Sequence, residues 1–262
     1  MNSACTILMY HVVGAPRGPH EGRTCCPSAS FARQMQCLAE EGWNVIPLAA
    51  LMQARRGEGH LPPRAVVITF DDGTACTHAQ ALPVLRKHGF PATVFVVAGL
   101  IGGRCDWADS GRDPGREMLS VPQLRELSAS GVSIGSHAVQ HRRLAGLPAA
   151  DLLQEVAGSK ALLEDALGAA VPHFAYPYGS HDRATVDAVQ AAGYEAACST
   201  LMGRNRSAAS PFLLQRTEIK GGDALWQFRL KLHAGTHDMP PWSVLRSAAR
   251  RTLRASLPNP AS

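Results

Sequence analysis

Two adjacent carboxylates, Asp71 and Asp72, occur in the stretch ITFDDG. The run at 65–70 has the composition of a buried strand, and neighbouring negative charges at its end are costly unless a cation compensates them. Downstream, SHAVQH carries His137 and His141 four positions apart, and on a helical turn this spacing places both imidazoles on one face. Two histidines and one carboxylate leave positions open for water and suit Zn²⁺. The sequence therefore predicts a divalent metal site, with Co²⁺ or Ni²⁺ as alternatives to zinc.

The two aspartates are expected to have different roles. Adjacent side chains that leave a strand point in different directions, so one carboxylate can bind the metal while the other faces a water held on it. A bound metal lowers the pKa of water from about 15.7 to near 7. The neighbouring carboxylate then only needs to accept the proton as the water attacks a carbonyl. These residues predict a metal-dependent hydrolase.

Strand-like runs alternate with amphipathic segments along most of the chain. We expect strands at 6–10, 65–70, 92–97, 131–135, 173–176, 195–199 and 213–219. Helices are expected at 30–41, 77–88, 121–130, 149–167 and 183–192, and several end at a glycine placed to cap a helix. Repeated strand–helix units indicate an α/β fold with mostly parallel strands, and about seven of them favour a distorted (β/α) barrel. In such barrels the chemistry lies at the C-terminal ends of the strands, where the aspartate pair falls.

Composition and charge limit the partners. The chain has 262 residues, of which 45% are hydrophobic and 18% charged, enough for one large domain or two small ones. A net charge of +5, without blocks of like charge before the C-terminal region, argues against nucleic acid as the main partner. We expect a domain at 1–240 and a basic tail at 241–262. The tail predicts a solvated terminal helix or, alternatively, peripheral contact with a membrane surface.

Cysteine usage and the N-terminal residues bear on location. Seven cysteines without a C-x-x-C spacing indicate reduced thiols that pack as small apolar residues. The apolar run at 5–13 has no basic segment before it and is typical of a first strand, not of a signal peptide. The sequence contains no run of about 18 apolar residues, the length that a membrane-spanning helix needs. A cytoplasmic location is therefore the expectation.

Three motifs together carry a resemblance to a known family. TFDDG at 69–73, SHAVQH at 136–141 and FAYPYG at 174–179 resemble, in this order, the polysaccharide deacetylases of carbohydrate esterase family 4. The opening ILMYHVV at 7–13 is similar to the subgroup that deacetylates poly-N-acetylglucosamine-type exopolysaccharides, and the likeness extends over about 7–230. The resemblance implies a barrel and the hydrolysis of an N-acetyl group from an amino sugar in a poly- or oligosaccharide or glycan precursor, releasing acetate.

The resemblance also implies roles for individual residues. It makes Asp71 the catalytic base, and it makes Asp72, His137 and His141 the metal ligands. In FAYPYG the family uses the backbone N–H of the tyrosine after proline, here Tyr178, as a donor to the oxyanion. Removing such a donor typically costs about 100- to 1,000-fold in rate.

The general acid and the group that orients Asp71 match the family less directly. The family's general acid is a histidine, which in many members lies in a late leucine-x-histidine motif. The exopolysaccharide subgroup resembles a circular permutation with this histidine near the start, which maps to His11, and His233 in KLHAG is the alternative. An arginine often opens the third motif and orients the aspartate, but Ala175 stands there. We expect Arg216 in LQRTEI to replace it, because a buried arginine needs a partner; an exposed strand position is the alternative.

Other residues are candidates for substrate contact. Tyr10, Tyr176 and Pro177 are expected to line the sugar site, since aromatic faces stack on sugar rings, although aromatic residues more often pack in a core. The segment 99–118, rich in Gly, Asp and Arg, is expected to form a surface loop that shapes the groove. GVSIG formally matches the nucleophile-elbow pattern, but we expect Ser133 in the middle of a strand, where that chemistry is excluded.

Two further functions stay open at this point. The same metal site could serve an amidase that acts on a small acylated amine or a lipid-linked sugar. A non-catalytic carbohydrate-binding relative would keep the barrel but lose a ligand or the base, and the complete set of Asp71, Asp72, His137 and His141 argues against it.

Overall fold

The computed structural model describes residues 4–17, 19–106, 114–206 and 210–236. The basic tail expected at 241–262 lies outside these residues. Within them, none of the helices combines the length and the apolar character needed to cross a membrane.

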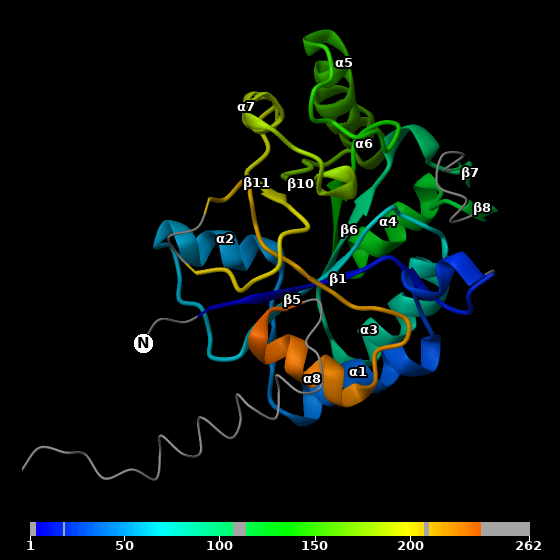
Figure 1. Ribbon diagram of the computed structural model, residues 1–262, viewed down its shortest axis with the longest axis vertical. Coiled ribbons are helices and arrows are strands. Elements are labelled where there is room, and N and C mark those ends of the chain that lie inside the picture. The colour runs from blue at the N-terminus through cyan, green and yellow to red at the C-terminus, as the bar shows by residue number, and fades with distance from the viewer. Residues whose placement is uncertain (1–3, 18, 107–113, 207–209, 237–262) are drawn as a thin grey trace, which may run out of the picture.

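The main sheet is a row of parallel strands that curls into a distorted barrel (Figure 1), which confirms the expected fold. The path runs through β11 (Ala196–Cys198), β10 (His173–Ala175), β9 (Val132–Ser136), β6 (Ala92–Val96), β5 (Ala65–Phe70), β1 (Thr6–Tyr10) and β12 (Thr217–Glu218). An additional strand, β4 (Asn44–Val45), pairs with the start of β5.

The segment that contains β12 joins the two ends of this row. Leu214 forms a parallel bridge to Cys198 at the end of β11, and Thr217 pairs with Leu8 in β1. The strand expected at 213–219 is therefore split: only Thr217–Glu218 is a regular strand, and the part before it bonds to β11 instead.

Helices lie around the sheet (Figure 1). They are α1 (Ser28–Glu40), α2 (Leu48–Arg56), α3 (Leu82–His88), α4 (Val121–Ala129), α5 (Ala149–Leu153), α6 (Ser159–Leu167), α7 (Arg183–Ala191) and α8 (Leu225–Ala234). Two expected helices contain π-helical turns, η2 (Thr77–Ala81) before α3 and η4 (Gln154–Gly158) between α5 and α6. Such turns do not alter the apolar pattern enough to be read from sequence.

Short elements missing from the sequence analysis complete the fold. Besides α2 and β4, they include a parallel pair, β2 (Val12–Val13) with β3 (Cys25–Cys26), and an antiparallel pair, β7 (Arg104–Asp106) with β8 (Pro114–Glu117). The expected loop at 99–118 thus contains strands on either side of residues that are not described. Each of these strands is too short to show a periodic pattern.

Alternation along β5 divides the core into two parts. Val66, Ile68 and Phe70 belong to the cluster that includes the apolar faces of α1 and α3. Ala65 and Val67 belong to a second cluster, which also contains small residues of β10 and β11 and lies inside the barrel. Successive strand side chains point to opposite faces, so the odd-numbered positions of β5 face the interior. If this alternation continues along the chain, the side chains of Thr69 and Asp71 also point into the barrel.

Candidate active site

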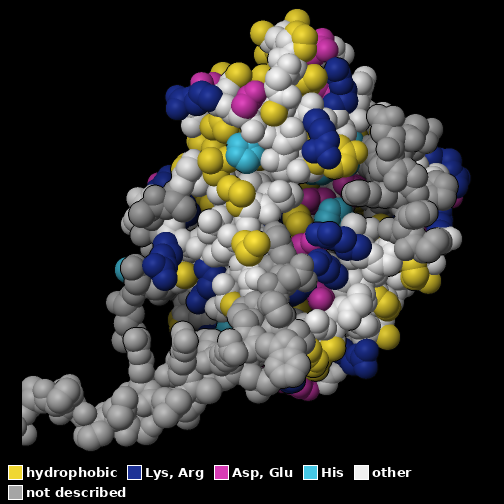
Figure 2. All heavy atoms as spheres, in the orientation of Figure 1, with side chains coloured by type: hydrophobic (Ala, Val, Ile, Leu, Met, Phe, Trp, Pro, Cys, Tyr) yellow, Lys and Arg dark blue, Asp and Glu magenta, His cyan; other side chains and the backbone are white. Residues whose placement is uncertain are grey.

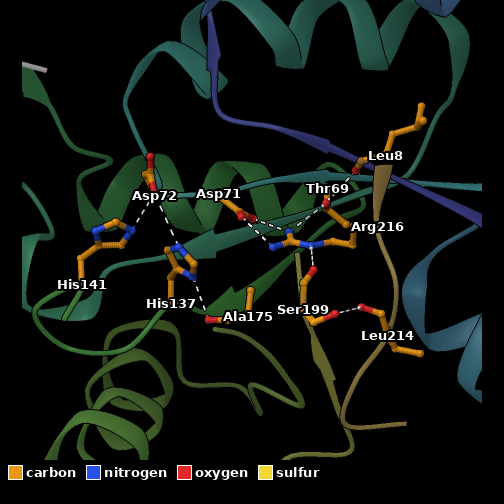
Figure 3. A network of polar contacts seen from close by, with 10 residues as sticks. All are labelled: Leu8, Thr69, Asp71, Asp72, His137, His141, Ala175, Ser199, Leu214 and Arg216. Atoms are coloured by element: carbon orange, nitrogen blue, oxygen red, sulfur yellow. Dashed lines mark hydrogen bonds and ion pairs between the residues drawn. The ribbon is translucent and has the colours of Figure 1, made fainter. Parts of the chain in front are cut away.

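Asp71 directly follows β5 and contacts a buried arginine. Arg216 donates from Nη1 to Asp71 Oδ1 at 2.6 Å and from Nη2 to Oδ2 at 2.8 Å (Figure 3). Both side chains are buried, with 3% of the Asp71 side chain and none of the Arg216 side chain exposed. Two parallel charge-assisted hydrogen bonds fix the carboxylate in position and in orientation. The arginine expected to face Asp71 therefore reaches it from the segment beside β12.

Two further N–H groups of Arg216 also have acceptors inside the barrel. Nε donates to the carbonyl of Ser199 at 2.9 Å, and Nη1 lies 3.3 Å from Thr69 Oγ1. The guanidinium also lies over the Phe95 ring, 5.6 Å from its centroid. The apolar cluster inside the barrel contains small residues, among them Ala175, as well as Phe95. Ala175, which stands where the family often has an arginine, belongs to this interior cluster.

Asp72 turns away from its neighbour towards the two histidines. Its backbone has a φ of 73°, in the left-handed region that non-glycine residues rarely occupy. This turn breaks the alternation of side chains along the strand. It brings Asp72 Oδ1 to 3.3 Å from His141 Nε2 and 3.6 Å from His137 Nε2. Figure 3 shows the consequence: Asp71 faces Arg216, whereas Asp72 faces the imidazoles. Strain of this kind costs about 1–3 kcal/mol and persists only where surrounding contacts hold it.

The two histidines lie in a loop after β9 and not on a helical turn, so that part of the sequence interpretation is wrong. Ala138 and His141 both have positive φ, 64° and 56°, which no α-helix contains. The loop nevertheless brings the rings together, with centroids 4.9 Å apart. Spacing of four residues was sufficient to identify the pair, although the backbone achieves the contact differently.

Asp72, His137 and His141 together fit a divalent cation. Each offers one ligand atom, and the three atoms lie within 4.8 Å of one another. His137 Nδ1 lies 2.8 Å from the carbonyl of Ala175, which can only accept, so Nδ1 carries the proton. In a neutral ring the lone pair of Nε2 then faces the carboxylate of Asp72, and a cation between these two acceptors would satisfy both.

Electrostatics in the group favour the ionisation states that a metal requires. Burial lowers the pKa of His137 to about 4, against the opposing pull of Asp71 and Asp72, so the ring is neutral near pH 7. Burial alone would raise the pKa of Asp72, but the hydrogen bond from His141 and nearby positive charge outweigh it and hold that pKa well below its usual range. The chain thus presents a carboxylate and a neutral imidazole, the forms that bind metal.

His11 lies on the same side of the barrel, directly after β1. Positive charge on its ring would lower the pKa of Asp71, Asp72 and Glu218. The side chain is half-buried, and among the described residues its enclosed Nδ1 has no hydrogen-bond partner. The alternative histidine, His233, lies on α8 with its ring 5.0 Å from that of Trp43.

Tyr178 borders the metal-ligand group from the 3-10 turn η5 (Pro177–Gly179), which follows β10. Its hydroxyl lies 3.2 Å from His141 Nδ1, its ring centroid lies 4.5 Å from that of His141, and 38% of the residue is exposed. Its φ of 57° again lies in the left-handed region. Arg143 also lies over this ring, with its Cζ 4.6 Å from the centroid.

The other residues expected to contact sugar lie in the core. Tyr10 and Tyr176 have no exposed surface, and their hydroxyls donate to Gln34 Oε1 at 2.8 Å and to the carbonyl of Phe212 at 3.0 Å. Pro177 is buried as well. A ring enclosed by protein cannot stack on a sugar, so the expectation is wrong for both tyrosines, and their polar ends are satisfied by core partners.

Sequence reasoning missed three residues that support the site. Thr69 and Ser199 receive hydrogen bonds from Arg216, and Glu155 in η4 accepts hydrogen bonds from the loop between the histidines. The strand parity of ITFDDG could have identified Thr69. Glu155 is a carboxylate next to Val156 on the buried face of an amphipathic segment, and that position was the available signal.

The face of the molecule drawn in Figure 2 carries many charged side chains. Near the middle of the face drawn in Figure 2, acidic and histidine side chains lie together, with Lys and Arg side chains beside them. The candidate site itself combines the carboxylate of Asp71, the metal-ligand group of Asp72, His137 and His141, and a further histidine, His11. Chemically, it could bind a cation, accept a proton and donate one.

Comparison with known proteins gives concordant results. The sequence profile of the polysaccharide deacetylase family matches residues 58–197, more than half of the chain. YxkH of Bacillus subtilis (strain 168), described as a candidate polysaccharide deacetylase, is 26% identical over 216 residues, which cover 82% of this chain and 71% of that protein. A poly-beta-1,6-N-acetyl-D-glucosamine N-deacetylase of Escherichia coli (strain K12) is 30% identical over 121 residues, 42% of this chain but only 17% of the relative.

Solved structures share the fold over most of the chain. IcaB from Ammonifex degensii superposes with a TM-score of 0.77 at 26% identity, covering 89% of this chain and 99% of that one. The Streptococcus pyogenes deacetylase PplD, solved with acetate, also has a TM-score of 0.77, at 23% identity and with 88% and 99% of the two chains covered.

Proposed function

Because this chain belongs to the polysaccharide deacetylase family, hydrolases that act on N-acetyl groups of polysaccharides, we propose that it is a metal-dependent N-deacetylase of an amino sugar in a poly- or oligosaccharide or glycan precursor. The observation that carries this proposal is the convergence of Asp72, His137 and His141 beside an Asp71 already paired with Arg216. The products are acetate and a free sugar amine.

Asp72, His137 and His141 hold the divalent cation in this proposal, with zinc as the first choice and Co²⁺ or Ni²⁺ as alternatives. When bound there, such an ion lowers the pKa of a water and polarises the acetamide carbonyl. The hydrogen bond from His137 to Ala175 keeps the Nε2 lone pair directed at the cation position. The contact between His141 and the Tyr178 hydroxyl acts in the same way on the second ring.

Asp71 is the proposed general base. Burial raises the pKa of this carboxyl. Arg216 and other nearby positive charge lower that pKa by more than burial raises it, so Asp71 is ionised at neutral pH. A carboxylate held by a bidentate guanidinium still has lone pairs available, since its two oxygens offer about four acceptor positions. Arg216 therefore orients the base and leaves it able to accept a proton from the attacking water.

His11 and Tyr178 complete the proposed mechanism. The backbone N–H of Tyr178 donates to the oxyanion as the acetamide carbonyl is attacked, a contribution of about 100- to 1,000-fold in similar sites. His11 donates a proton to the departing amine. Its position after β1, on the side of the barrel that holds Asp71 and Asp72, supports this choice over His233, whose ring packs against Trp43.

The relatives support a proposal for the substrate class. Proteins named for deacetylation of poly-beta-1,6-N-acetyl-D-glucosamine match parts of this chain, and IcaB shares its fold. We therefore propose N-acetylglucosamine units as the substrate. Membrane contact through the tail at 241–262 and a cytoplasmic location stay predictions.

The decisive experiment measures acetate release by the purified protein, with and without a chelator. N-acetylglucosamine oligomers, the monomer and small acylated amines should be compared at equal acetyl concentration. We expect release from the oligomers that the chelator abolishes and added zinc restores. Faster release from acylated amines would favour a small-molecule amidase, and binding of oligomers without any acetate release by the zinc-loaded protein would indicate a non-catalytic relative.

A further inference from the structure

A buried carboxylate outside the proposed catalytic group contacts the loop that carries both histidines. Glu155 is 2% exposed and lies in the π-helical turn η4 between α5 and α6. One oxygen, Oε2, accepts from the backbone N–H of Val139 and from that of Gln140, both at 2.9 Å. These two residues lie between His137 and His141, so Glu155 bonds to the connection between the two metal-ligating side chains.

The backbone N–H groups between the ligands can be accounted for individually. The N–H of His137 donates to the carbonyl of Val96 at 2.8 Å, and that of Ala138 to Ser136 Oγ at 3.3 Å. The next two, of Val139 and Gln140, both go to Glu155. Glu155 therefore provides two of the four bonds that hold this stretch through its amides.

The opposite side of the loop is fixed by the 3-10 turn η3 (Ala98–Leu100), which follows β6. The N–H of Ala98 donates to the carbonyl of Ala138, and the N–H of Gly99 donates to that of Val139, both at 2.9 Å. A Cβ on Gly99 would lie 2.6 Å from the Val139 oxygen, so the approach requires glycine. The loop is thus held between the residues that follow β6 and Glu155, and the Glu155 side chain can be substituted without a backbone clash.

The loop needs such support because its conformation is unfavourable by itself. Ala138 and His141 have positive φ values, and two consecutive N–H groups point to the same side. Consecutive N–H groups of this kind form a concave site that favours an anion, and hydrogen bonds to a carboxylate are stronger than those to a neutral acceptor. A π-helical turn changes the direction of side chains relative to a regular helix, and such turns are frequent at functional sites. Here the turn carries the residue that reaches the loop.

We infer that Glu155 is a positioning residue that sets the separation and orientation of His137 and His141 and thereby tunes metal affinity. The inference rests on the proposed metal-dependent function. Glu155 does not touch substrate or cation in this arrangement. It acts through the Val139 and Gln140 amides, in the manner of the outer partners of metal ligands, whose loss typically lowers metal affinity about 10- to 100-fold.

Glu155→Ala is the first variant to test. We expect its zinc affinity, measured by competition with a chromophoric chelator, to fall about 10- to 100-fold. Amide hydrogen exchange at Val139 and Gln140 should accelerate in the metal-free protein, because both N–H groups lose their acceptor. Neither measurement requires catalysis, so a protein that binds zinc but releases no acetate would refute the proposed function while leaving this inference intact.

Glu155→Gln and Glu155→Asp separate reach from charge. Glutamine keeps an oxygen at the same distance from the backbone, so it should retain zinc affinity within about threefold if acceptance of the two N–H groups is what matters. Aspartate keeps the charge but is one methylene shorter, and we expect a loss closer to that of alanine. These two variants also keep the test valid if Glu155→Ala fails to fold.

Glu164→Ala is the matched control. Glu164 lies nine residues further along the same helical segment and accepts from the backbone N–H of Val171 at 2.9 Å, away from the ligand loop. Its removal should lower thermal stability without changing zinc affinity. Wild-type affinity in Glu155→Ala, or equal losses in Glu155→Ala and Glu164→Ala, would overturn the inference. Absence of zinc binding by the wild-type protein would overturn it as well, together with the proposed metal dependence.

Discussion

Asp71 and Asp72 are neighbours in sequence but occupy opposite kinds of environment. Asp71 points into the barrel, as the odd-numbered positions of β5 do. Arg216 balances its charge there through two hydrogen bonds of 2.6 and 2.8 Å. Asp72 breaks this alternation of side chains through a positive φ and faces two imidazoles at 3.3 and 3.6 Å. The charge of Asp71 is balanced by an arginine of the chain itself. Asp72 lies among metal-ligand atoms, whose interactions an added cation would strengthen.

The difference teaches how one short motif can supply two functions. A buried ion pair is retained at a considerable desolvation cost, so the Arg216 contact is more useful as a positioning device than as a source of stability. The Asp72 group stores local strain instead, since Asp72 and His141 both have left-handed backbones. We therefore expect substitutions in the two halves of the site to have different effects. Loss of the Arg216–Asp71 contact should lower folding stability, and loss of the Asp72 group should lower metal affinity.

Removing Asp72 should produce the largest effect. We expect Asp72→Ala to lose zinc binding in a chelator-competition assay and to lower acetate release by about 10,000-fold, the scale seen when one essential catalytic group is deleted. Asp71→Asn is the matched variant: it should lose activity to a similar extent but bind zinc nearly as well as the wild-type protein. Full activity in Asp72→Ala, or loss of zinc by Asp71→Asn alone, would reverse the assignment of the two carboxylates.

Arg216→Met tests the other half. The change leaves the buried Asp71 without its counter-charge, and breaking a buried ion pair in this way costs about 3–5 kcal/mol of folding free energy. Denaturant unfolding should show this loss, whereas zinc affinity per folded molecule should stay within a few-fold of wild type. Arg216→Lys would keep the charge but not the bidentate geometry, so we expect it to recover stability only in part. A variant as stable as wild type would mean that Asp71 is held mainly by other contacts.

The sequence predicted the parts of this comparison that depend on residue type and periodicity. β1 and β5 begin and end at the expected residues because they are continuous apolar runs, and the Asp–His–His group was recognisable from spacing. The contact between Arg216 and Asp71 could be anticipated because a charge in a strand-like stretch needs a partner. The helical turn expected at His137 to His141 does not occur, since tertiary hydrogen bonds from the residues that follow β6 and from Glu155 impose another conformation.

What could not be predicted depends on contacts distant in sequence. The rings of Tyr10 and Tyr176 are enclosed by segments whose packing no local pattern reveals, so they were wrongly expected at the sugar site. Strand β12 is short because its segment bonds first to β11 and then to β1 as the barrel curls. The π-turn that presents Glu155 shifts the helix register without disturbing its apolar face.

Acid sensitivity offers a sharper comparison, between His137 and a second buried histidine. Burial lowers the pKa of His173 to about 4, as it does that of His137, but neither ring nitrogen of His173 has a hydrogen-bond partner among the described residues. Because the pKa is about 6.5 in the unfolded chain, the unfolded state binds more protons between these values. Stability should therefore fall as the pH drops from about 6.5 to about 4, by up to about 3 kcal/mol for His173.

His173→Leu should remove this part of the acid loss. The difference in unfolding free energy between pH 7 and pH 4.5 should be smaller in the variant than in the metal-free wild-type protein, by denaturant titration at both values. The contribution of His137 should persist in both proteins. An unchanged difference would show that His173 does not titrate on unfolding and that the acid loss arises elsewhere.

The smallest expected effect concerns a single hydroxyl. Tyr178→Phe removes the group 3.2 Å from His141 Nδ1 but keeps the ring that packs on the imidazole. We expect zinc affinity to fall about 10-fold, the lower end of the range for outer partners of metal ligands, because the hydroxyl only orients one of three ligands. Tyr10→Phe is the matched control, since its hydroxyl serves Gln34 in the core. It should cost about 1 kcal/mol of stability and leave zinc affinity unchanged. If the two variants changed zinc affinity alike, the hydroxyl of Tyr178 would be acting on the fold and not on His141. Its contact with His141 would then not belong to the part of the site that controls metal binding.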